Sequence, residues 1–321
     1  MAASHRPADM AKSRVSHYSK TSHAMPLCTR KREIRRRSEV TATESIELNP
    51  ADVAAHYDDL DQFYREFWGE HVHHGLWTTG RETPEEATRA LVSVVAEEAR
   101  VHEGSVVCDA GCGYGATARL LATEYGARVT ALTISGAQHA YAAALDPDLE
   151  NPIYLLRDWL KNDLPSESFD AVIAIESTEH MPDLSAFFQQ ASRVLRPGGR
   201  LTICAWLTRE TPGRAETHWL IEPICREGRL RAMENVAEYQ RLGGEAGLHP
   251  DGVQDVSLRV KKTWPICAKR VVKAFFRNPE HRRFLLREGG PNRVFALTLF
   301  RIWLAYEVGA MRYGILTFSK T

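Results

Sequence analysis

The sequence lacks a long uninterrupted hydrophobic run. Its longest apolar stretch, residues 294–316, is broken by Arg301, Glu307 and Arg312. A helix that crosses a bilayer needs roughly 20 predominantly apolar residues. We therefore expect no membrane span, and we interpret this stretch as a core helix followed by a strand. The amino-terminal region also lacks the apolar core of a signal peptide.

Cysteine pairs at metal or redox spacing are also missing. No two cysteines form a Cys-x-x-Cys pair, and none have the spacing of a zinc site. Cys108 and Cys112 flank a glycine-rich segment and are expected to be small packing residues. This usage fits a reduced, cytoplasmic setting. The six cysteines are Cys28, Cys108, Cys112, Cys204, Cys225 and Cys267.

The chain has no net charge, because 41 basic residues balance 41 acidic ones. Its global charge therefore gives no reason to expect a nucleic-acid partner. Residues 1–40 are an exception, with seven Arg and three Lys against three acidic residues. We predict a basic, disordered tail over residues 1–50. A transit peptide rich in Arg and Ser is one alternative, and a true start at Met25 is another.

Residues 51–321 are expected to form one domain in which strands and helices alternate. Residues 51–77 have a helical, aromatic pattern, and Thr83 with Pro84 begins a helix that runs to about residue 101. Strands are predicted at 105–109, 128–133, 153–157, 169–176 and 200–206, with helices at 115–125, 136–145 and 184–195 between them. This alternation indicates βαβ units and a parallel sheet.

After residue 206 the alternation ends. Residues 207–245 are predicted to be largely helical, as an insert that would cap a substrate site. Strands are predicted again at 253–260 and 311–319. Between them, residues 261–276 are basic and aromatic.

A glycine-rich segment, Asp109-Ala110-Gly111-Cys112-Gly113-Tyr114-Gly115, joins the first predicted strand to its helix. Glycines let the backbone approach a ligand closely, and the start of a helix offers free N–H groups. Gly111, Gly113 and Ala116 also fit the dinucleotide pattern G-x-G-x-x-A. The segment predicts a cofactor site but leaves its class open.

Two features distinguish the cofactor classes. A dinucleotide enzyme usually carries an acidic residue at the end of the second strand, and here Thr133-Ile134-Ser135 stands there. Asp109 precedes the first glycine by two residues, where its carboxylate suits an ammonium group and not a pyrophosphate. Both features favour a cofactor with an amino-acid end.

Four segments carry a resemblance to a known family. They are Phe67-Trp68-Gly69-Glu70-His71-Val72-His73-His74-Gly75, Ala131-Leu132-Thr133-Ile134-Ser135-Gly136-Ala137-Gln138, Glu176-Ser177-Thr178-Glu179-His180-Met181-Pro182-Asp183 and Met311-Arg312-Tyr313-Gly314-Ile315-Leu316-Thr317. Through them the chain resembles class I S-adenosylmethionine-dependent methyltransferases, and among these the γ-tocopherol methyltransferase-like enzymes and sterol C-methyltransferases. The resemblance covers about residues 52–321. Ala131 departs from the glycine that the family has there.

The resemblance implies a Rossmann-like α/β fold: a mostly parallel seven-stranded sheet with an antiparallel last strand, an amino-terminal lid helix and a helical cap insert. It also implies S-adenosyl-L-methionine as cofactor. Asp109 and the glycines would hold its methionine end, Gln138 its ribose and Asp158 its adenine. The implied cofactor-binding residues are Tyr57, Tyr64, Asp109, Gly111, Gly113, Gly115, Thr133, Ser135, Gln138, Asp158, Trp159 and Glu176. Packing alone is the alternative role of the two tyrosines.

Glu176, Glu179 and His180 form an E-x-x-E-H cluster after the fourth predicted strand. One interpretation is base catalysis or orientation of the acceptor, because His titrates near neutrality. A divalent metal site and a purely anchoring role are the alternatives. His71, His73 and His74 are expected to close over the site and not to bind a metal. We predict no resident metal.

The acceptor side is expected after residue 200, where aromatic residues are frequent. Apolar walls suit a lipophilic ligand, although aromatics usually belong to the core. Those concerned are Trp206, Trp219, Trp264, Phe275, Phe276, Phe295 and Trp303. Lys and Arg between residues 259 and 273 form either a patch that rests on anionic lipid or a solvated face.

We therefore expect methyl transfer to a lipophilic small molecule: a prenylated phenol or quinol, a sterol-like compound or a ring of secondary metabolism. Alternatives are O- or N-methylation of a polar natural product, a nucleic-acid methyltransferase and a non-catalytic cofactor-binding protein. The second lacks an Asn-Pro-Pro-Tyr-type motif after the fourth strand. We expect no nucleic-acid partner, a cytoplasmic or peripheral membrane location, and a monomer or homodimer.

Overall fold

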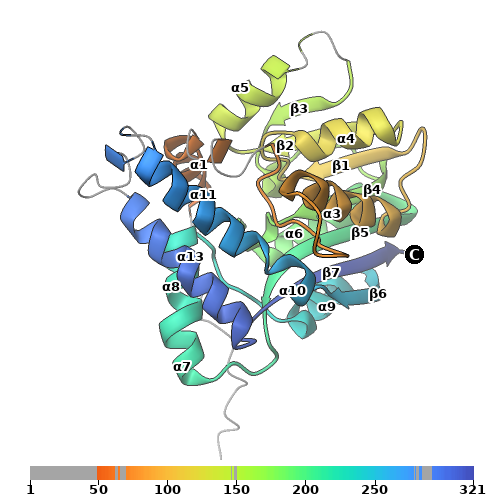
Figure 1. The fold of residues 1–321 in the computed structure, drawn as a ribbon. Coiled ribbons are helices and arrows are strands. Elements are labelled where there is room, and N and C mark those ends of the chain that lie inside the picture. Colours follow the sequence, from red (N-terminus) through yellow and green to blue (C-terminus); the bar gives the residue numbers. More distant parts are fainter. Residues whose placement is uncertain are drawn as a thin grey trace, which may run out of the picture. The chain divides into compact units, whose positions relative to one another are not determined.

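A seven-stranded sheet forms the centre of the described structure (Figure 1). The computed structural model describes residues 49–61, 64, 65, 70–145, 147, 150–277, 279, 282, 283 and 291–321, with side chains from residue 297 in the last range. These residues belong to one compact unit, residues 40–321. The predicted tail falls almost wholly outside the described residues.

The sheet has the strand order β3-β2-β1-β4-β5-β7-β6. The pairs among β1 to β5 are parallel, whereas β7 runs antiparallel to both β5 and β6. This arrangement confirms the predicted fold class. The strands are β1 (Val106–Ala110), β2 (Arg128–Thr133), β3 (Ile153–Leu156), β4 (Phe169–Ile175), β5 (Leu195–Thr208), β6 (Leu248–Asp255) and β7 (Met311–Lys320).

Helices cover both faces of the sheet because its central strands are apolar on both sides. Within β1, Val107 packs with α3 and α4, whereas Cys108 packs with α6 and α9 on the opposite face. The helices and 3-10 turns of this part are α1 (Pro50–Asp59), α3 (Pro84–Glu98), α4 (Ala116–Glu124), α5 (Gly136–Leu145), η1 (Trp159–Lys161), η2 (Thr178–His180) and α6 (Leu184–Val194).

The later helices follow β5 in the chain. Most of them carry residues, among them Ile221, Cys225, Trp264 and Ile302, into the same buried cluster as α3 and α4, whereas α9 belongs to the core on the opposite face. Within the described part, no helix combines the length and the hydropathy needed to cross a bilayer. These elements are α7 (Arg214–Glu216), the π-helical η3 (Thr217–Ile221), α8 (Glu222–Gly228), α9 (Val236–Glu245), α10 (Ser257–Val260), α11 (Thr263–Arg277) and α13 (Pro291–Glu307).

Local sequence signals explain several of these boundaries. The Thr83 hydroxyl accepts from the Glu86 N–H at 3.1 Å while the Glu86 carboxylate accepts from the Thr83 N–H at 2.7 Å. This capping box starts α3 where Thr83 and Pro84 predicted it. The Asp183 side chain caps α6 by accepting from the Ala186 N–H at 2.9 Å. The predicted core helix and strand over residues 294–316 correspond to α13 and β7.

Three predicted elements are wrong in extent. Where one helix is expected over residues 51–77, α1 ends at Asp59, residues 61, 64 and 65 are again helical, and residues 70–77 are not helical. The strand expected at 253–260 is β6, which starts five residues earlier at Leu248, and residues 257–260 are the helix α10. Beyond Leu248, β6 is an edge strand with mostly exposed residues and an irregular pairing between Pro250 and Gly252, so hydrophobic alternation cannot reveal it. β5 begins at Leu195, five residues before the start of the strand predicted at 200–206.

Two adjacent glycines of α9 test this packing. A Cβ atom on Gly243 would lie 2.5 Å from Cε1 of the buried Phe318 ring, whereas one on Gly244 would meet nothing within 4 Å. We expect Gly243→Ala to lower the free energy of unfolding by about 1–3 kcal/mol through overpacking. Gly244→Ala, the matched control, should raise it by up to about 1 kcal/mol through helix propensity. Urea unfolding measures both, and equal effects would contradict the packing described.

Candidate active site

Two adjoining cavities lie at the carboxyl ends of the parallel strands. The strand-end cavity, of about 800 Å³ including its open part, lies over β1, β2 and β4 and is lined by Gly111, Thr133 and Asp158 among others. The cap cavity, of about 710 Å³, lies beneath α8, α11 and α13. Both cavities are lined by Tyr57, Val72, Glu176 and His180, so these four residues form a common wall. An open α/β sheet binds ligands at this end of its strands.

The glycine loop combines close packing with open space. Gly111 has φ +99°, and a Cβ there would lie 2.4 Å from that of Ser177. Gly115 faces the Tyr154 ring, which leaves 2.5 Å for a Cβ. Gly113 has φ +53°, but a Cβ on it would meet only the Gln138 amide, at 4.0 Å. Gly111 and Gly115 are therefore required by packing, whereas Gly113 leaves a cradle open to a ligand.

Asp109 ends β1 as a buried carboxylate with an unused oxygen. It is 2 % exposed, and its Oδ2 has no hydrogen-bond partner among the described residues. Burial raises its pKa to about 7. The carboxylate lines a recess beside the glycine loop together with His71, His73 and Gly113. A cationic group in this recess would satisfy Asp109, because an unpaired buried carboxylate is costly.

The end of β2 presents an amide in place of an acidic residue. The Thr133 hydroxyl donates to Gln138 Oε1 at 2.7 Å, which leaves the Gln138 Nε2 donors near Gly113. Thr133 and Gln138 line the strand-end cavity. Ser135 does not belong to that lining and is fully buried. Its hydroxyl donates to Asp58 of α1 at 2.5 Å.

Asp58 is a site residue that the sequence did not reveal. Its Oδ1 accepts from the Ser135 hydroxyl and, at 3.1 Å, from the Ala137 N–H at the start of α5. A side chain 77 residues away thus caps this helix, and no local cap signal points to it. The contact fastens α1 to the strand-end cavity.

Asp158 and Trp159 lie at the far end of the strand-end cavity. One oxygen of Asp158 accepts from the Leu160 N–H at 2.9 Å and caps η1. Trp159 is 3 % exposed, and its indole N–H donates to the Phe187 carbonyl at 3.3 Å. Trp159 is therefore held rigidly with little surface facing the cavity.

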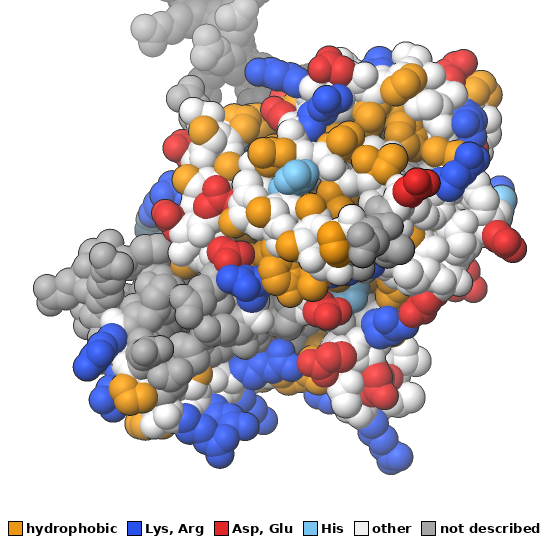
Figure 2. Space-filling model, turned by 90° about the horizontal axis from the view of Figure 1, so that it is seen from above, with side chains coloured by type: hydrophobic (Ala, Val, Ile, Leu, Met, Phe, Trp, Pro, Cys, Tyr) orange, Lys and Arg blue, Asp and Glu red, His pale blue; other side chains and the backbone are white. Residues whose placement is uncertain are grey.

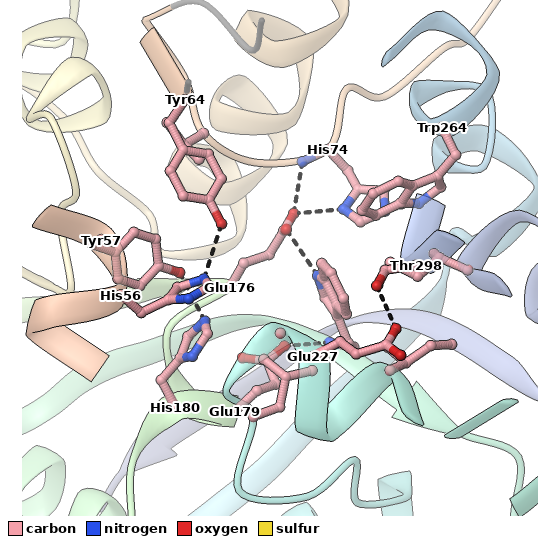
Figure 3. A pocket seen from close by; sticks show the side chains of 16 residues that line it. His56, Tyr57, Tyr64, His74, Glu176, Glu179, His180, Glu227, Trp264 and Thr298 are labelled. Carbon is pink, nitrogen blue, oxygen red and sulfur yellow. Dashed lines mark hydrogen bonds and ion pairs between the residues drawn. The ribbon is translucent and has the colours of Figure 1, made fainter. Parts of the chain in front are cut away.

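Tyr57 of α1 and Tyr64, which follows α1 in the chain, differ in the cavities that they line. Tyr57 lines both, whereas Tyr64 lines only the cap cavity. Their rings lie 5.4 Å apart, and the Tyr64 hydroxyl lies 3.4 Å from His56 Nε2 (Figure 3). His56, which the sequence did not single out, also faces the cap cavity. The Phe67-Trp68-Gly69 part of the resembling segment lies outside the described residues.

Glu176 receives four hydrogen bonds on its two carboxylate oxygens. Oε1 accepts from the His74 N–H at 2.7 Å, His74 Nδ1 at 2.9 Å and the Tyr313 hydroxyl at 2.7 Å. Oε2 accepts from the Trp206 indole at 2.8 Å. Burial raises the pKa of Glu176, but the His74 ring and its hydrogen bonds lower it by more than burial raises it, to about 2. The carboxylate is therefore ionised and occupied as an acceptor.

His74 continues this network to the cap helices. Its Nε2 lies 2.8 Å from the indole N–H of Trp264, which can only donate. His74 Nε2 is therefore an acceptor, and the ring proton sits on Nδ1 toward Glu176. The Tyr306 hydroxyl is 3.3 Å from the same Nε2. Figure 3 shows Glu176, His74 and Trp264 in sequence along one side of the cap cavity.

His180 is held as a neutral ring by hydrogen bonds at both nitrogens. Its Nδ1 lies 2.9 Å from the Arg229 carbonyl, which can only accept, so Nδ1 carries the proton. Nε2 then accepts from the Tyr57 hydroxyl at 2.9 Å. Burial lowers the pKa of His180, against smaller opposing effects of Arg229 and Glu176. His180 is therefore unprotonated at neutral pH.

Glu179 is buried beside the cap cavity. Its Oε1 accepts from the Trp206 N–H at 2.5 Å, and its Oε2 from the Thr178 hydroxyl at 3.1 Å. Burial raises its pKa to about 7 even though the Trp206 bond lowers it. Among the described residues, no three His, Cys, Asp or Glu side chains are grouped so as to hold a metal. His71 and His73 line the glycine-loop recess, whereas His74 lines the cap cavity.

The cap cavity has mostly apolar walls, and one of its ends, at Glu227, is polar. Trp206 and Trp264 line it, as expected of acceptor walls, together with apolar residues of α8 and α13. At the polar end, Thr298 and Arg301 donate to the Glu227 carboxylate. Other predicted wall residues are placed elsewhere. Phe275 packs on the core, whereas Trp219, Phe276 and Trp303 are exposed by 69 %, 78 % and 38 %. The Phe295 side chain lies outside the described residues.

Removal of the His74 ring should lower the stability of the protein. His74→Ala leaves the buried Glu176 charge without one partner and Trp264 without its acceptor, and we expect a loss of about 3–5 kcal/mol in unfolding free energy. The matched control is His218→Ala, since His218 forms a surface pair with Glu222 at 3.6 Å. It should cost less than about 1 kcal/mol. Guanidinium unfolding compares the two, and similar losses would refute the central role of His74.

Comparisons with known proteins agree with this geometry. The family model of mycolic acid cyclopropane synthetase matches residues 45–271. The chain is 35 % identical to a 27-O-demethylrifamycin SV methyltransferase of Amycolatopsis mediterranei over 69 % of this chain and 82 % of that protein. It is 28 % identical to a chloroplastic tocopherol O-methyltransferase of Arabidopsis thaliana over 87 % of this chain and 84 % of that protein.

A solved structure similar in fold is a mycolic acid cyclopropane synthase complexed with S-adenosylhomocysteine. Its TM-score is 0.75 at 20 % identity, with 86 % of this chain and 99 % of that chain covered. The family match extends from α1 to α11 and thus includes the glycine loop, the end of β2 and the common wall of both cavities. The chain therefore belongs to the mycolic acid cyclopropane synthetase family and is a class I S-adenosylmethionine-dependent methyltransferase.

Proposed function

We propose that the enzyme transfers the methyl group of S-adenosylmethionine to a hydroxyl-bearing lipophilic small molecule held in the cap cavity. The acceptor would be a prenylated phenol or quinol, a sterol-like compound or a ring of secondary metabolism. One observation carries the proposal: an apolar cavity adjoins the cofactor side and shares a wall of Tyr57, Val72, Glu176 and His180 with it. The names of the rifamycin and tocopherol relatives support this acceptor class.

The residues present fit the cofactor. The methionine end would lie in the recess beside the glycine loop, with its ammonium group on the unused Oδ2 of Asp109. Gln138 Nε2 is a donor for the ribose hydroxyls, and the free surface of Asp158 is an acceptor for the adenine amine. When bound, the cofactor supplies a methyl group that its positive sulfur has already activated.

His180 is our candidate for the general base. Its Nε2 lone pair points into the common wall, where the Tyr57 hydroxyl now occupies it. An acceptor hydroxyl in the place of Tyr57 would give its proton to Nε2. The resulting oxygen, or the ring carbon made electron-rich by it, would be the nucleophile. General base catalysis contributes typically 10²- to 10⁴-fold to the rate.

Glu176 and Glu179 would support this step by holding the walls of the site in place. Both carboxylate oxygens of Glu176 accept hydrogen bonds, and its pKa of about 2 keeps it ionised. Glu179 fixes the backbone of Trp206 and thereby the cavity wall. Positioning and exclusion of water are then the remaining contributions of the protein. The segment α1 supplies both, because Tyr57 and Asp58 fasten it over the site.

Cofactor affinity should depend on the ionisation of Asp109. With a pKa of about 7 in the free protein, the carboxylate is mostly protonated below that pH and mostly charged above it. We expect affinity for S-adenosylhomocysteine to rise about tenfold from pH 6 to pH 8. Asp109→Asn should bind far more weakly, with no such pH dependence. Calorimetry measures this, and a flat wild-type profile would refute the assignment.

Two further variants separate cofactor binding from chemistry. Gly113→Val fills the open cradle and should abolish cofactor binding, because its φ of +53° also disfavours a branched residue. His180→Gln should lower kcat about 10²- to 10⁴-fold while cofactor affinity changes less than about threefold. His218→Gln, which changes an exposed histidine outside both cavities, is the control and should retain the wild-type activity. Unchanged kcat in His180→Gln would exclude it as the base.

A further inference from the structure

The outer faces of α11 and α13 expose a stripe of large apolar side chains. On α13, Leu297, Phe300 and Trp303 are exposed by 49 %, 56 % and 38 %. Their spacing of three residues places them on one side of the helix. On α11, Val272 and Phe276 are exposed by 56 % and 78 %. Isolated exposed apolar residues are ordinary, but a contiguous group marks an interaction surface.

Positive charge borders this stripe. The helix α11 contains Lys269, Arg270, Lys273 and Arg277 and no acidic residue. Lys269, Lys273 and Arg277 are exposed, whereas Arg270 pairs with Glu85. The acidic residue at the end of α13, Glu307, is paired with Lys261. In Figure 2, blue Lys and Arg side chains lie beside orange apolar ones at the lower left, and red acidic ones lie farther to the right.

The inner faces of the same two helices form a wall of the cap cavity. Trp264 of α11 and Thr298 and Ile302 of α13 line it. The two helices also pack against each other (Figure 1). One pair of helices therefore separates the acceptor cavity from the exposed apolar stripe, so a ligand that enters beside them has only one helix layer to pass.

We propose that the outer faces of α11 and α13 dock on an anionic lipid surface, which delivers the lipophilic acceptor to the cap cavity. Delivery of the acceptor rests on the proposed function, whereas docking on lipid does not. Apolar residues flanked by Lys and Arg suit the boundary between lipid headgroups and acyl chains.

Charge argues against two other occupants of this surface. A second copy of the chain would bring the same basic α11 against itself in a two-fold contact. Residues 1–40, with ten Lys and Arg against three acidic residues, carry the same sign as α11. Only an anionic partner complements the exposed lysines, and a bilayer also accepts the exposed Phe276 and Phe300.

Sedimentation of the full chain with vesicles tests the proposal. We expect binding to vesicles of phosphatidylcholine with phosphatidylglycerol, and little binding to phosphatidylcholine alone. Lys269→Gln with Lys273→Gln should weaken binding roughly 10- to 30-fold. Phe276→Ser with Phe300→Ser should weaken it at low and at high salt, because insertion of these rings is not screened. The control Arg100→Gln with Arg128→Gln removes two exposed charges elsewhere in the fold and should bind like the wild type.

The outcomes distinguish this proposal from the proposed function. Equal binding to both vesicle types, or equal binding by the lysine pair and its control, would overturn lipid docking. A dimer that dissociates when Phe300 is replaced would assign the surface to a second copy of the chain and would also overturn lipid docking. Retained vesicle binding without methyl transfer to any lipophilic acceptor would refute the proposed function and leave the docking surface intact.

Discussion

The buried carboxylate of Glu176 is the interaction on which both cavities depend. It ends β4 with φ +51°, a conformation that costs energy for any residue other than glycine. Hydrogen bonds from His74, Tyr313 and Trp206 offset that cost. Through His74 the network reaches Trp264 of α11. One negative charge thereby orders residues from β4, β5, β7 and a cap helix around a common wall.

Asp109 and Glu176 show how hydrogen bonding, and not burial alone, gives two carboxylates of one site different pKa values. Both are strongly buried. Glu176 has a full set of donors and a pKa of about 2, whereas Asp109 has an oxygen without a partner and a pKa of about 7. The first is a permanent anchor. The second is an incomplete site whose charged form is stabilised by a cationic ligand.

The sequence predicts those parts of this protein that depend on local signals. Buried strands, capped helices and the glycine loop were found because each has a periodicity or a turn residue of its own, as in α3 and α6. The edge strand β6 was misplaced because its exposed residues do not alternate. The capping of α5 by Asp58 and the solvent-facing positions of Trp219 and Phe276 depend on long-range packing, which no local pattern encodes. For the same reason, Tyr64 was expected at the cofactor but lies beside the cap cavity alone.

The double use of the Ser135 hydroxyl has a thermodynamic consequence. It donates to Asp58 of α1 and accepts from the Gln138 N–H, whose side chain lines the strand-end cavity. Any motion that lifts α1 away therefore also breaks two hydrogen bonds at the start of α5, beside the strand-end cavity. Closure of α1 and occupancy of the site are then linked equilibria, and each must favour the other by the same free energy. The apparent cofactor affinity of the enzyme is scaled by the fraction of molecules in which α1 is closed.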